Sequence, residues 1–353
     1  MQNSFGLPYG TLKVTKTQFL QRKDYDDMYR LSGPEDFVSF INGHGYSEDI
    51  AESSDYKGLD LLESANNLHL AKMNRRALAV TPQNGKDLIV SFLTKWDIQN
   101  IKTILVSKNL DLKIEESTLY LVSESNTQLG VFAGLLDRND YHNLIAMDNV
   151  DDIISYTLRF GYGKALLAYM DEYRKSNNIA TLLLSLDLYY FDLMKERFRF
   201  YSGSEGPIFR FIKKTIDIKN IMTILKFIEF KANHNVSNYL LTGGTLTSQT
   251  IDDLSKSTDV EEFSQKIKGY SDFSKGFDFY KRKGSLVGIE GELNRNLYWE
   301  FVNIMEMSAL SLNNIIAFLL RAEAEWKDIR NLAFSRFYAI DDETIKMTTI
   351  NLG

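Results

Sequence analysis

The chain repeats one five-residue stretch three times, first as Asp97-Ile98-Gln99-Asn100-Ile101. The stretch returns as Asp217-Ile218-Lys219-Asn220-Ile221 and as Asp328-Ile329-Arg330-Asn331-Leu332, after 120 and 111 residues. An Asp and an Asn three positions apart lie on one face of a helix, and the Ile and Leu positions lie on a neighbouring face. One such match is expected by chance, whereas three matches at similar intervals indicate a repeated unit.

Apolar residues flank the three copies in the same way. The positions nine and eight residues before each Asp are Leu88 and Ile89, Ile208 and Phe209, and Leu319 and Leu320. The repeated object is therefore predicted to be a helix with an apolar stripe and a small polar pair beside it.

A second pattern repeats before each copy of the first. In each copy two acidic residues precede an apolar residue. This apolar residue lies 60, 64 or 65 residues before the Asp of the five-residue stretch that follows it. Acidic residues favour the positive end of a helix dipole, and Gly commonly ends a helix. Each copy therefore predicts one short helix followed by Gly-Tyr. The copies are Pro34-Glu35-Asp36-Phe37 with Gly45-Tyr46, Val150-Asp151-Asp152-Ile153 with Gly161-Tyr162, and Val260-Glu261-Glu262-Phe263 with Gly269-Tyr270.

These repeats predict an all-α protein, because period-two alternation of β-branched residues is scarce along the chain. We expect three homologous helical units spanning residues 1–125, 126–240 and 241–353, which are ordinary sizes for a small domain. Each unit should contain one long helix that carries the polar pair. These helices are expected over residues 86–108, 207–231 and 312–337.

The remaining segments are assigned from apolar periodicity and from Gly and Pro breaks. We expect one helix over 9–31 and a polar loop over 47–58. A turn is expected over 201–207, a loop over 241–246, and at most one short helix in the tail over 341–353. Further helices are expected over 59–78, 129–136, 153–158, 163–175, 182–199, 251–254, 260–267, 273–280 and 289–307.

Composition limits the class of protein. With 353 residues and 44% hydrophobic content the chain can build sizeable cores, and its net charge of −6 argues against a nucleic-acid-binding body. The absence of cysteine excludes disulfides, thiolate metal sites and Cys nucleophiles. No signal peptide is visible at the start, and the longest apolar run, 315–320, is far too short to span a membrane. We therefore expect a soluble chain whose membrane role, if any, is peripheral.

Motifs for chemistry are weak throughout the chain. The four histidines do not form H-x-x-H, and Gly161-Tyr162-Gly163-Lys164 lacks the P-loop spacing, as does the Gly243-Gly244 loop. The basic and aromatic run 197–201 stands alone in an acidic chain, so arginines that snorkel over a helix end explain it better than nucleic-acid binding. Catalytic, cofactor and metal sites are not expected. The histidines are His44, His69, His142 and His234, and the Asp pairs that lack a third acid are Asp26-Asp27, Asp151-Asp152, Asp252-Asp253 and Asp341-Asp342.

The repeated polar pairs have two interpretations. In the first, which we favour, hydrogen bonds from the pairs to neighbouring helices or loops fix the shape of each unit. In the second, the pairs line a shared axis and contact a partner. The residues concerned are Asp97 and Asn100, Asp217 and Asn220, and Asp328 and Asn331.

The three late helices resemble those of a known family, the C subunits of archaeal and bacterial V/A-type rotary ATPases, whose eukaryotic relatives are the d subunits. The resemblance covers essentially the whole chain and is strongest at 96–101, 217–221 and 326–332, with support at 186–191 and 240–246. The family often has a basic Leu-Arg-x-Lys pattern soon after the repeated motif. The first unit here has Val106-Ser107-Lys108 instead, and the second has only Lys226.

The resemblance implies a non-catalytic coupling protein without cofactors. The family member is a funnel with pseudo-threefold symmetry and a central cavity. It lies peripherally on the cytoplasmic face of the membrane, joins the membrane proteolipid rotor ring to the central axle of the soluble head, and carries torque between them. ATP chemistry takes place in the head.

Two other functions compete with this one. A free α-helical repeat scaffold would recruit unrelated partners, and an all-α enzyme would have an activity of its own. Co-purification with a ring and an axle would separate the coupling protein from the scaffold, and ATP hydrolysis by the isolated chain would favour the enzyme.

Overall fold

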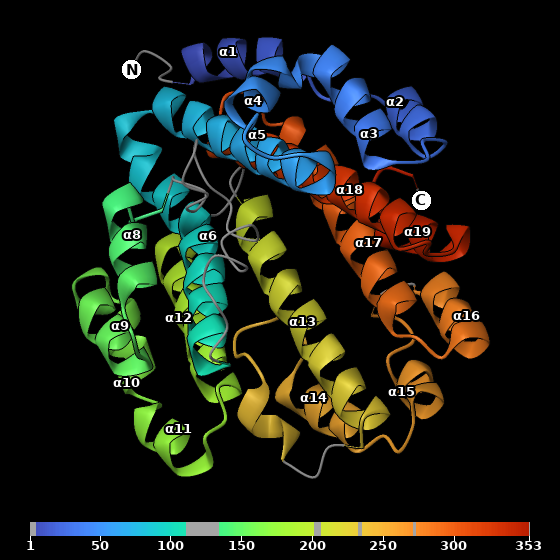
Figure 1. Ribbon diagram of the computed structural model, residues 1–353. Coiled ribbons are helices and arrows are strands. Elements are labelled where there is room, and N and C mark those ends of the chain that lie inside the picture. The colour runs from blue at the N-terminus through green and yellow to red at the C-terminus, as the bar shows by residue number, and fades with distance from the viewer. Residues whose placement is uncertain (1–4, 111–133, 201–205, 232–234, 271–272, 353) are drawn as a thin grey trace.

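The structure, a computed structural model, describes residues 5–110, 134–200, 206–231, 235–270 and 273–352. These residues form helices and turns, and no strand occurs among them, so the prediction of an all-α fold is confirmed. Six long helices make up the body of the molecule (Figure 1). They are α5 (Gly58–Val80), α6 (Gln83–Asn109), α12 (Ala180–Phe198), α13 (Gly206–Glu229), α17 (Val287–Glu306) and α18 (Leu312–Phe337).

Short helices fill the segments between the long ones. The first group precedes α5, the second lies between α6 and α12, and the third lies between α13 and α17. The first group is α1 (Gly6–Lys16), α2 (Arg22–Met28), α3 (Pro34–Ile41), the π-helical turn η1 (Asn42–Tyr46) and α4 (Ser47–Glu52). The second group is α8 (Arg138–Ala146), α9 (Val150–Thr157), the 3-10 turn η3 (Leu158–Phe160), α10 (Tyr162–Leu167) and α11 (Met170–Ser176). The third group is η5 (Val236–Tyr239), α14 (Ser248–Ser255), α15 (Val260–Lys266) and α16 (Ser274–Lys283), and α19 (Asp342–Thr348) lies at the C-terminal end.

The three groups share a common arrangement of caps. In each group two successive helices have N-cap residues twelve positions apart, at 21 and 33, 137 and 149, and 247 and 259. Side-chain oxygens of Asp137, Asn149, Thr247 and Asp259 accept a backbone N–H of the first turn, which satisfies a donor that the helix itself cannot pair.

A Gly in the left-handed region follows the second capped helix of each group. Gly45, Gly161 and Gly269 have φ of +94°, +91° and +98°, a conformation that other residues adopt only with strain. The next residue is in each case the Tyr of the repeated Gly-Tyr pair. The predictions of acidic first turns and of a Gly stop are confirmed in all three copies.

The long helices pair antiparallel. In α13 and α17, Lys214 Nζ lies 3.0 Å from Glu300 Oε2, and Lys226 Nζ lies 3.7 Å from Glu290 Oε2. The contacts between α5 and α18 run the same way, as do those between α6 and α12. This pairing brings the starts of α6, α13 and α18 to one end of the molecule, where an ideal Cβ on Gly85 would lie 2.8 Å from Leu312.

The main hydrophobic core includes that end and continues along α13 to α14 and α15. The apolar positions that flank the repeated motif contribute to it from all three long helices: Leu88 and Ile89, Ile208, and Leu319 and Leu320 are buried in one cluster, and Phe209 packs against it. A second cluster lies between α6 and the helices from α8 to α12. A third joins α2, α3 and η1 to the second half of α18 and to α19. The first and last parts of the chain therefore share a core, and the blue and red helices lie side by side in Figure 1.

The long helices match their predicted ranges to within a few residues, but several shorter predictions are wrong. The segment 9–31 is two helices, because the chain turns at 17–21 before the N-cap at Gln21. The segment 163–175 is likewise divided, and 47–52 is the helix α4 rather than part of a loop. The sequence pattern missed α8 altogether. The predicted helix at 129–136 and turn at 201–207 lie largely outside the described residues, as does His234.

Two glycine substitutions test the close packing of α16 on α17. A Cβ on Gly276 would lie 2.6 Å from the backbone oxygen of Gly288, whereas a Cβ on Gly10 meets nothing within 4 Å. We expect Gly276→Ala to lower the free energy of unfolding by about 1–3 kcal/mol, because the helices must separate. Gly10→Ala should raise it by about 0.5–1 kcal/mol through helix propensity. Urea denaturation measures both, and equal effects would contradict the close approach.

Candidate functional site

Asp97 is fully buried on α6 and collects donors from the segment that follows it. Its carboxylate accepts the backbone N–H of Leu135 at 2.6 Å and of Leu136 at 3.2 Å. The hydroxyls of Tyr141 and Tyr162 each donate to it at 2.7 Å. Residue 137, directly after Leu136, is the N-cap of α8. The carboxylate therefore determines where the next group of short helices begins.

Asp217 on α13 makes the same kind of contact one repeat later. It accepts the backbone N–H of Thr245 at 2.8 Å and of Leu246 at 3.1 Å, together with the Thr245 hydroxyl at 2.6 Å. The Tyr270 hydroxyl also donates to it. Residue 247, after Leu246, is the N-cap of α14.

The third copy uses two carboxylates on successive turns of α18. Asp328 accepts the backbone N–H of Ile350 at 2.7 Å and of Asn351 at 2.8 Å, both near the C-terminal end. Glu325 accepts the backbone N–H of Leu20 at 2.6 Å and the hydroxyl of Tyr46 at 2.8 Å. Residue 21, after Leu20, is the N-cap of α2. The last long helix therefore binds the first group of short helices, and the two ends of the chain are joined.

We call these contacts the Asp97 latch, the Asp217 latch and the end latch, the last formed by Glu325 and Asp328. In each latch a carboxylate accepts the N–H of the Leu before an N-cap, and the hydroxyl of the Tyr after the left-handed Gly. The pattern predicted the three Asp residues as a repeated set, and the Gly-Tyr repeat was a signal for their partners. Glu325 was missed because Thr94 and Lys214 occupy its place in the other copies.

The three Asn residues lie one turn after the Asp residues. Asn220 donates to the backbone oxygen of Leu241 and accepts its N–H, both at 2.8 Å. Asn331 donates to the backbone oxygen of Thr348 at 3.0 Å. Asn100 is buried at the same place on α6. Asn220 and Asn331 thus make hydrogen bonds to the backbone of neighbouring segments, which is the kind of contact that the packing interpretation predicts.

Burial dominates the electrostatics of the Asp97 latch and the end latch. It raises the pKa of Asp97 from 3.8 to about 6, although the hydrogen bonds from Tyr141, Tyr162 and the backbone pull the pKa down. Burial raises the pKa of Asp328 in the same way, to about 6, against its backbone hydrogen bonds. The pKa of Glu325 is also raised by burial.

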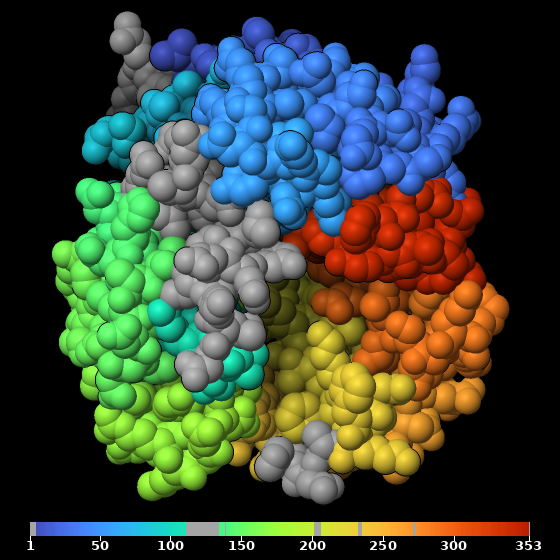
Figure 2. Space-filling view, in the orientation of Figure 1, coloured from blue at the N-terminus to red at the C-terminus, as the bar shows by residue number. Residues whose placement is uncertain are grey.

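A cavity of about 540 Å³ lies between the long helices, on the side of the repeated motif that faces away from the latches. Its wall includes residues from equivalent places in all three copies. Those two positions before the Asp are Lys95, Thr215 and Trp326, and those two positions after it are Gln99, Lys219 and Arg330. The space-filling view shows the molecule hollowed beside the teal and yellow parts that carry α6 and α13 (Figure 2). Of the six predicted polar residues only Asn331 lines the cavity.

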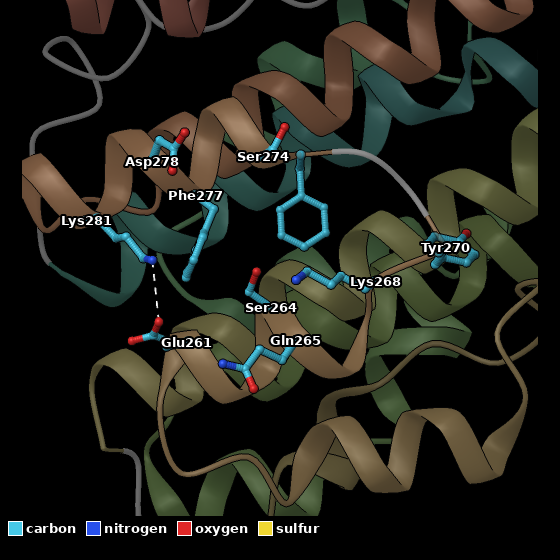
Figure 3. A pocket seen from close by; sticks show the side chains of 11 residues that line it. Glu261, Ser264, Gln265, Lys268, Tyr270, Ser274, Phe277, Asp278 and Lys281 are labelled. Carbon is cyan, nitrogen blue, oxygen red and sulfur yellow. Dashed lines mark ion pairs between the residues drawn. The ribbon is translucent and has the colours of Figure 1, made fainter.

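A second hollow, of about 610 Å³, lies between α15 and α16 (Figure 3). Lys281 Nζ lies 3.4 Å from Glu261 Oε1 at one side of it. The Tyr270 hydroxyl belongs to the Asp217 latch, and the lining residues include no histidine. The hollow therefore offers aromatic surface and charged side chains.

The other motifs singled out in the sequence lie in packing positions. His69 Nδ1 lies 2.7 Å from Asp49, and His44 Nε2 lies 3.5 Å from Asp24. The Arg199 guanidinium stacks on Phe200 at 4.4 Å, as expected for an arginine at a helix end. Within the described residues no three His, Cys, Asp or Glu side chains are grouped so that they could hold a metal ion, and no helix combines the length and apolar character needed to cross a bilayer.

Comparison with known proteins gives one consistent result. The model of the family described as ATP synthase (C/AC39) subunit matches residues 8–347. The chain is 33% identical over 345 residues to the C subunit of the A-type ATP synthase of Thermoplasma volcanium, with 97% of both chains covered. It is 32% identical over 338 residues to the protein of the same name from Thermoplasma acidophilum, with 95% of both covered. The corresponding Haloferax volcanii protein is 25% identical over 346 residues, with 97% of this chain and 96% of that protein covered.

Removal of the latch hydroxyls tests their contribution to stability. We expect Tyr46→Phe, Tyr162→Phe and Tyr270→Phe each to lower the free energy of unfolding by about 1.5–3 kcal/mol, because each removes a hydrogen bond to a carboxylate. Tyr338→Phe is the control, since that ring is 62% exposed and should change little. Urea denaturation gives the values. Latch variants that match the control would show that the hydroxyls do not stabilise the fold.

The raised pKa of Asp97 predicts a pH dependence. The folded-state pKa of about 6 exceeds the ordinary 3.8, so the associated stability is full below pH 3.8 and is lost as the pH rises through 6. Between pH 4 and pH 6 the free energy of unfolding should fall by up to about 1.4 kcal/mol per pH unit on account of this group.

The measurement is the slope of unfolding free energy against pH for the wild type and for Asp97→Asn. The variant should be less stable overall, and its downward slope should be shallower by the part that Asp97 contributes, while the part from Asp328, whose pKa is also about 6, remains. The exposed Asp55→Asn should keep the wild-type slope. Parallel curves for the wild type and Asp97→Asn would contradict the raised pKa.

Proposed function

We propose that the chain, which belongs to the ATP synthase (C/AC39) subunit family, is a non-catalytic central-stalk subunit of a V/A-type rotary ATPase or ATP synthase. It couples the central axle of the soluble, ATP-converting head to the proteolipid rotor ring in the membrane and transmits torque for ion transport. The relatives, which are named as C subunits of A-type ATP synthases, support this proposal.

The cavity is the observation that carries the proposal. Equivalent positions of α6, α13 and α18 line one space, and the apolar positions near the starts of these helices share one core. A space shared by three similar helices suits a socket for a partner on the common axis. We infer a funnel of pseudo-threefold symmetry built from the units 1–125, 126–240 and 241–353, with the axle entering its cavity.

The latches supply the stiffness that torque transmission needs. Each of them joins one proposed unit to the next, and the end latch joins the third unit to the first. A closed set of units can pass torque without opening at a free edge. The chain would lie on the cytoplasmic face of the membrane, held there peripherally through the ring.

A free α-helical repeat scaffold is the second candidate. The hollow between α15 and α16, with its aromatic lining, would suit a peptide partner of such a scaffold. The two functions differ in one respect, because only the coupling protein must turn together with both an axle and a ring.

Cross-linking in the assembled complex tests the proposal. The chain has no cysteine, so Gln99→Cys in the cavity wall gives one defined thiol to pair with a cysteine placed on the foot of the axle. We expect the disulfide to form and ATP-driven ion pumping to continue, because parts that rotate together tolerate a covalent link. The oxidised cysteine-free complex is the control. A disulfide that stops pumping, or a complex in which none forms, would contradict the placement.

Omission of the chain provides a second test. A complex reconstituted without it should hydrolyse ATP in the head but pump no ions, because the axle and ring are then unconnected. Pumping at the complete complex's rate would refute a coupling role, and ATP hydrolysis by the isolated chain would favour an enzyme instead.

A further inference from the structure

The cavity wall has the opposite charge sign to the rest of the chain. The chain as a whole has a net charge of −6. Within the described part of the chain, the charged residues of the wall are five cations, Lys95, Lys102, Lys219, Lys327 and Arg330, and three acids, Glu63, Asp187 and Glu323. A positively charged concave surface in an acidic protein is a local feature that needs its own explanation.

All three acids of the wall are already paired with cations of the wall. Lys102 Nζ lies 2.6 Å from Asp187 Oδ2, and Arg330 Nε lies 2.9 Å from Glu63 Oε1. Lys95 pairs with Glu323. These pairs neutralise three of the five cations and leave two lysines.

The two remaining cations are Lys219 and Lys327, and neither has an ion-pair partner within the described part of the chain. Both also line an adjoining cleft of about 330 Å³ between α12, α13 and α17. The charge of Lys219 helps to lower the pKa of Lys102, which is mainly lowered by burial. Cations that repel one another in a partly enclosed space gain most from an anionic guest.

The latches fix the positions of both lysines. Lys219 follows Asp217 by two residues, and Lys327 directly precedes Asp328. Because each Asp is buried and hydrogen-bonded to the backbone of the next segment, the turn of helix that carries each lysine is held in place. The two charges are therefore presented from rigid elements.

We propose that the cavity recognises acidic side chains on the foot of the axle, with Lys219 and Lys327 as the residues that bind them. The inference rests on the proposed function and adds the chemistry of the contact. An unpaired lysine on each of two neighbouring long helices would fix the rotational position of the foot as well as attract it. The aromatic residues Trp96, Tyr298 and Trp326 in the same wall suit the apolar sides of a helix end.

The experiment measures binding of the purified axle proteins to the full-length chain at 50 and 300 mM NaCl. The test variant is Lys219→Glu/Lys327→Glu. The control is Lys164→Glu/Lys175→Glu, which makes the same charge change on the exposed surface of α10 and α11. Helix content by circular dichroism and melting temperature show whether each variant is folded.

We expect the test variant to weaken binding about 10- to 100-fold at 50 mM NaCl, with a smaller ratio at 300 mM because salt screens the charges. The control should stay within about twofold of the wild type. Lys219→Gln/Lys327→Gln should fall between them, and this variant decides the question if the charge reversal impairs folding. An axle whose acidic foot residues are changed to Lys should recover affinity for the test variant.

Four results would overturn the inference. Wild-type affinity and salt dependence in the test variant would show that the lysines take no part, although the proposed function would stand. Equal losses in the test and control variants would indicate a non-specific charge effect. Co-sedimentation of the wild type with phosphatidylglycerol vesicles, lost in the test variant while axle binding is unchanged, would assign the lysines to lipid. Failure of the wild type to bind the axle at all would overturn the proposed function together with this inference.

Discussion

A buried carboxylate that must be supplied with hydrogen-bond donors is the constraint on which this structure depends. An unpaired charge in the interior is costly, so Asp97, Asp217 and the pair of Glu325 and Asp328 can be buried only where backbone N–H groups and hydroxyls converge on them. The next segment of chain provides those donors for Asp97, Asp217 and Asp328, and the first group of short helices provides them for Glu325. The long helices thereby determine where the following short helices start, and the last long helix does so for the first group.

The same turn of helix serves two purposes. Its Asp faces the segment of chain that follows the helix, whereas the residues two positions to either side of that Asp face the cavity. A change that disturbs a latch should therefore move side chains in the cavity wall, although no latch carboxylate lines the cavity. Packing and cavity shape are therefore coupled through the same turns of helix.

The sequence predicted the long helices well because apolar periodicity over more than twenty residues is a strong signal. It predicted the three Asp residues because they repeat. It failed where the deciding contact is not repeated or joins distant parts of the chain. Glu325, one turn before the repeated Asp, accepts the N–H of the Leu in the third copy. The break after α1 depends on the contact of Leu20 with α18. The sequence also did not predict the cavity wall, because which side of a repeated helix faces the cavity depends on how the copies pack.

Amide hydrogen exchange at Leu20, Leu136 and Leu246 tests the central claim most directly, because these N–H groups donate to the three latches from segments that would otherwise be loops. The account predicts that all three exchange as slowly as the amides in the middle of α6, α13 and α18. Exchange at the rate of exposed loop amides, in any of the three, would show that the latches do not hold these segments on the long helices.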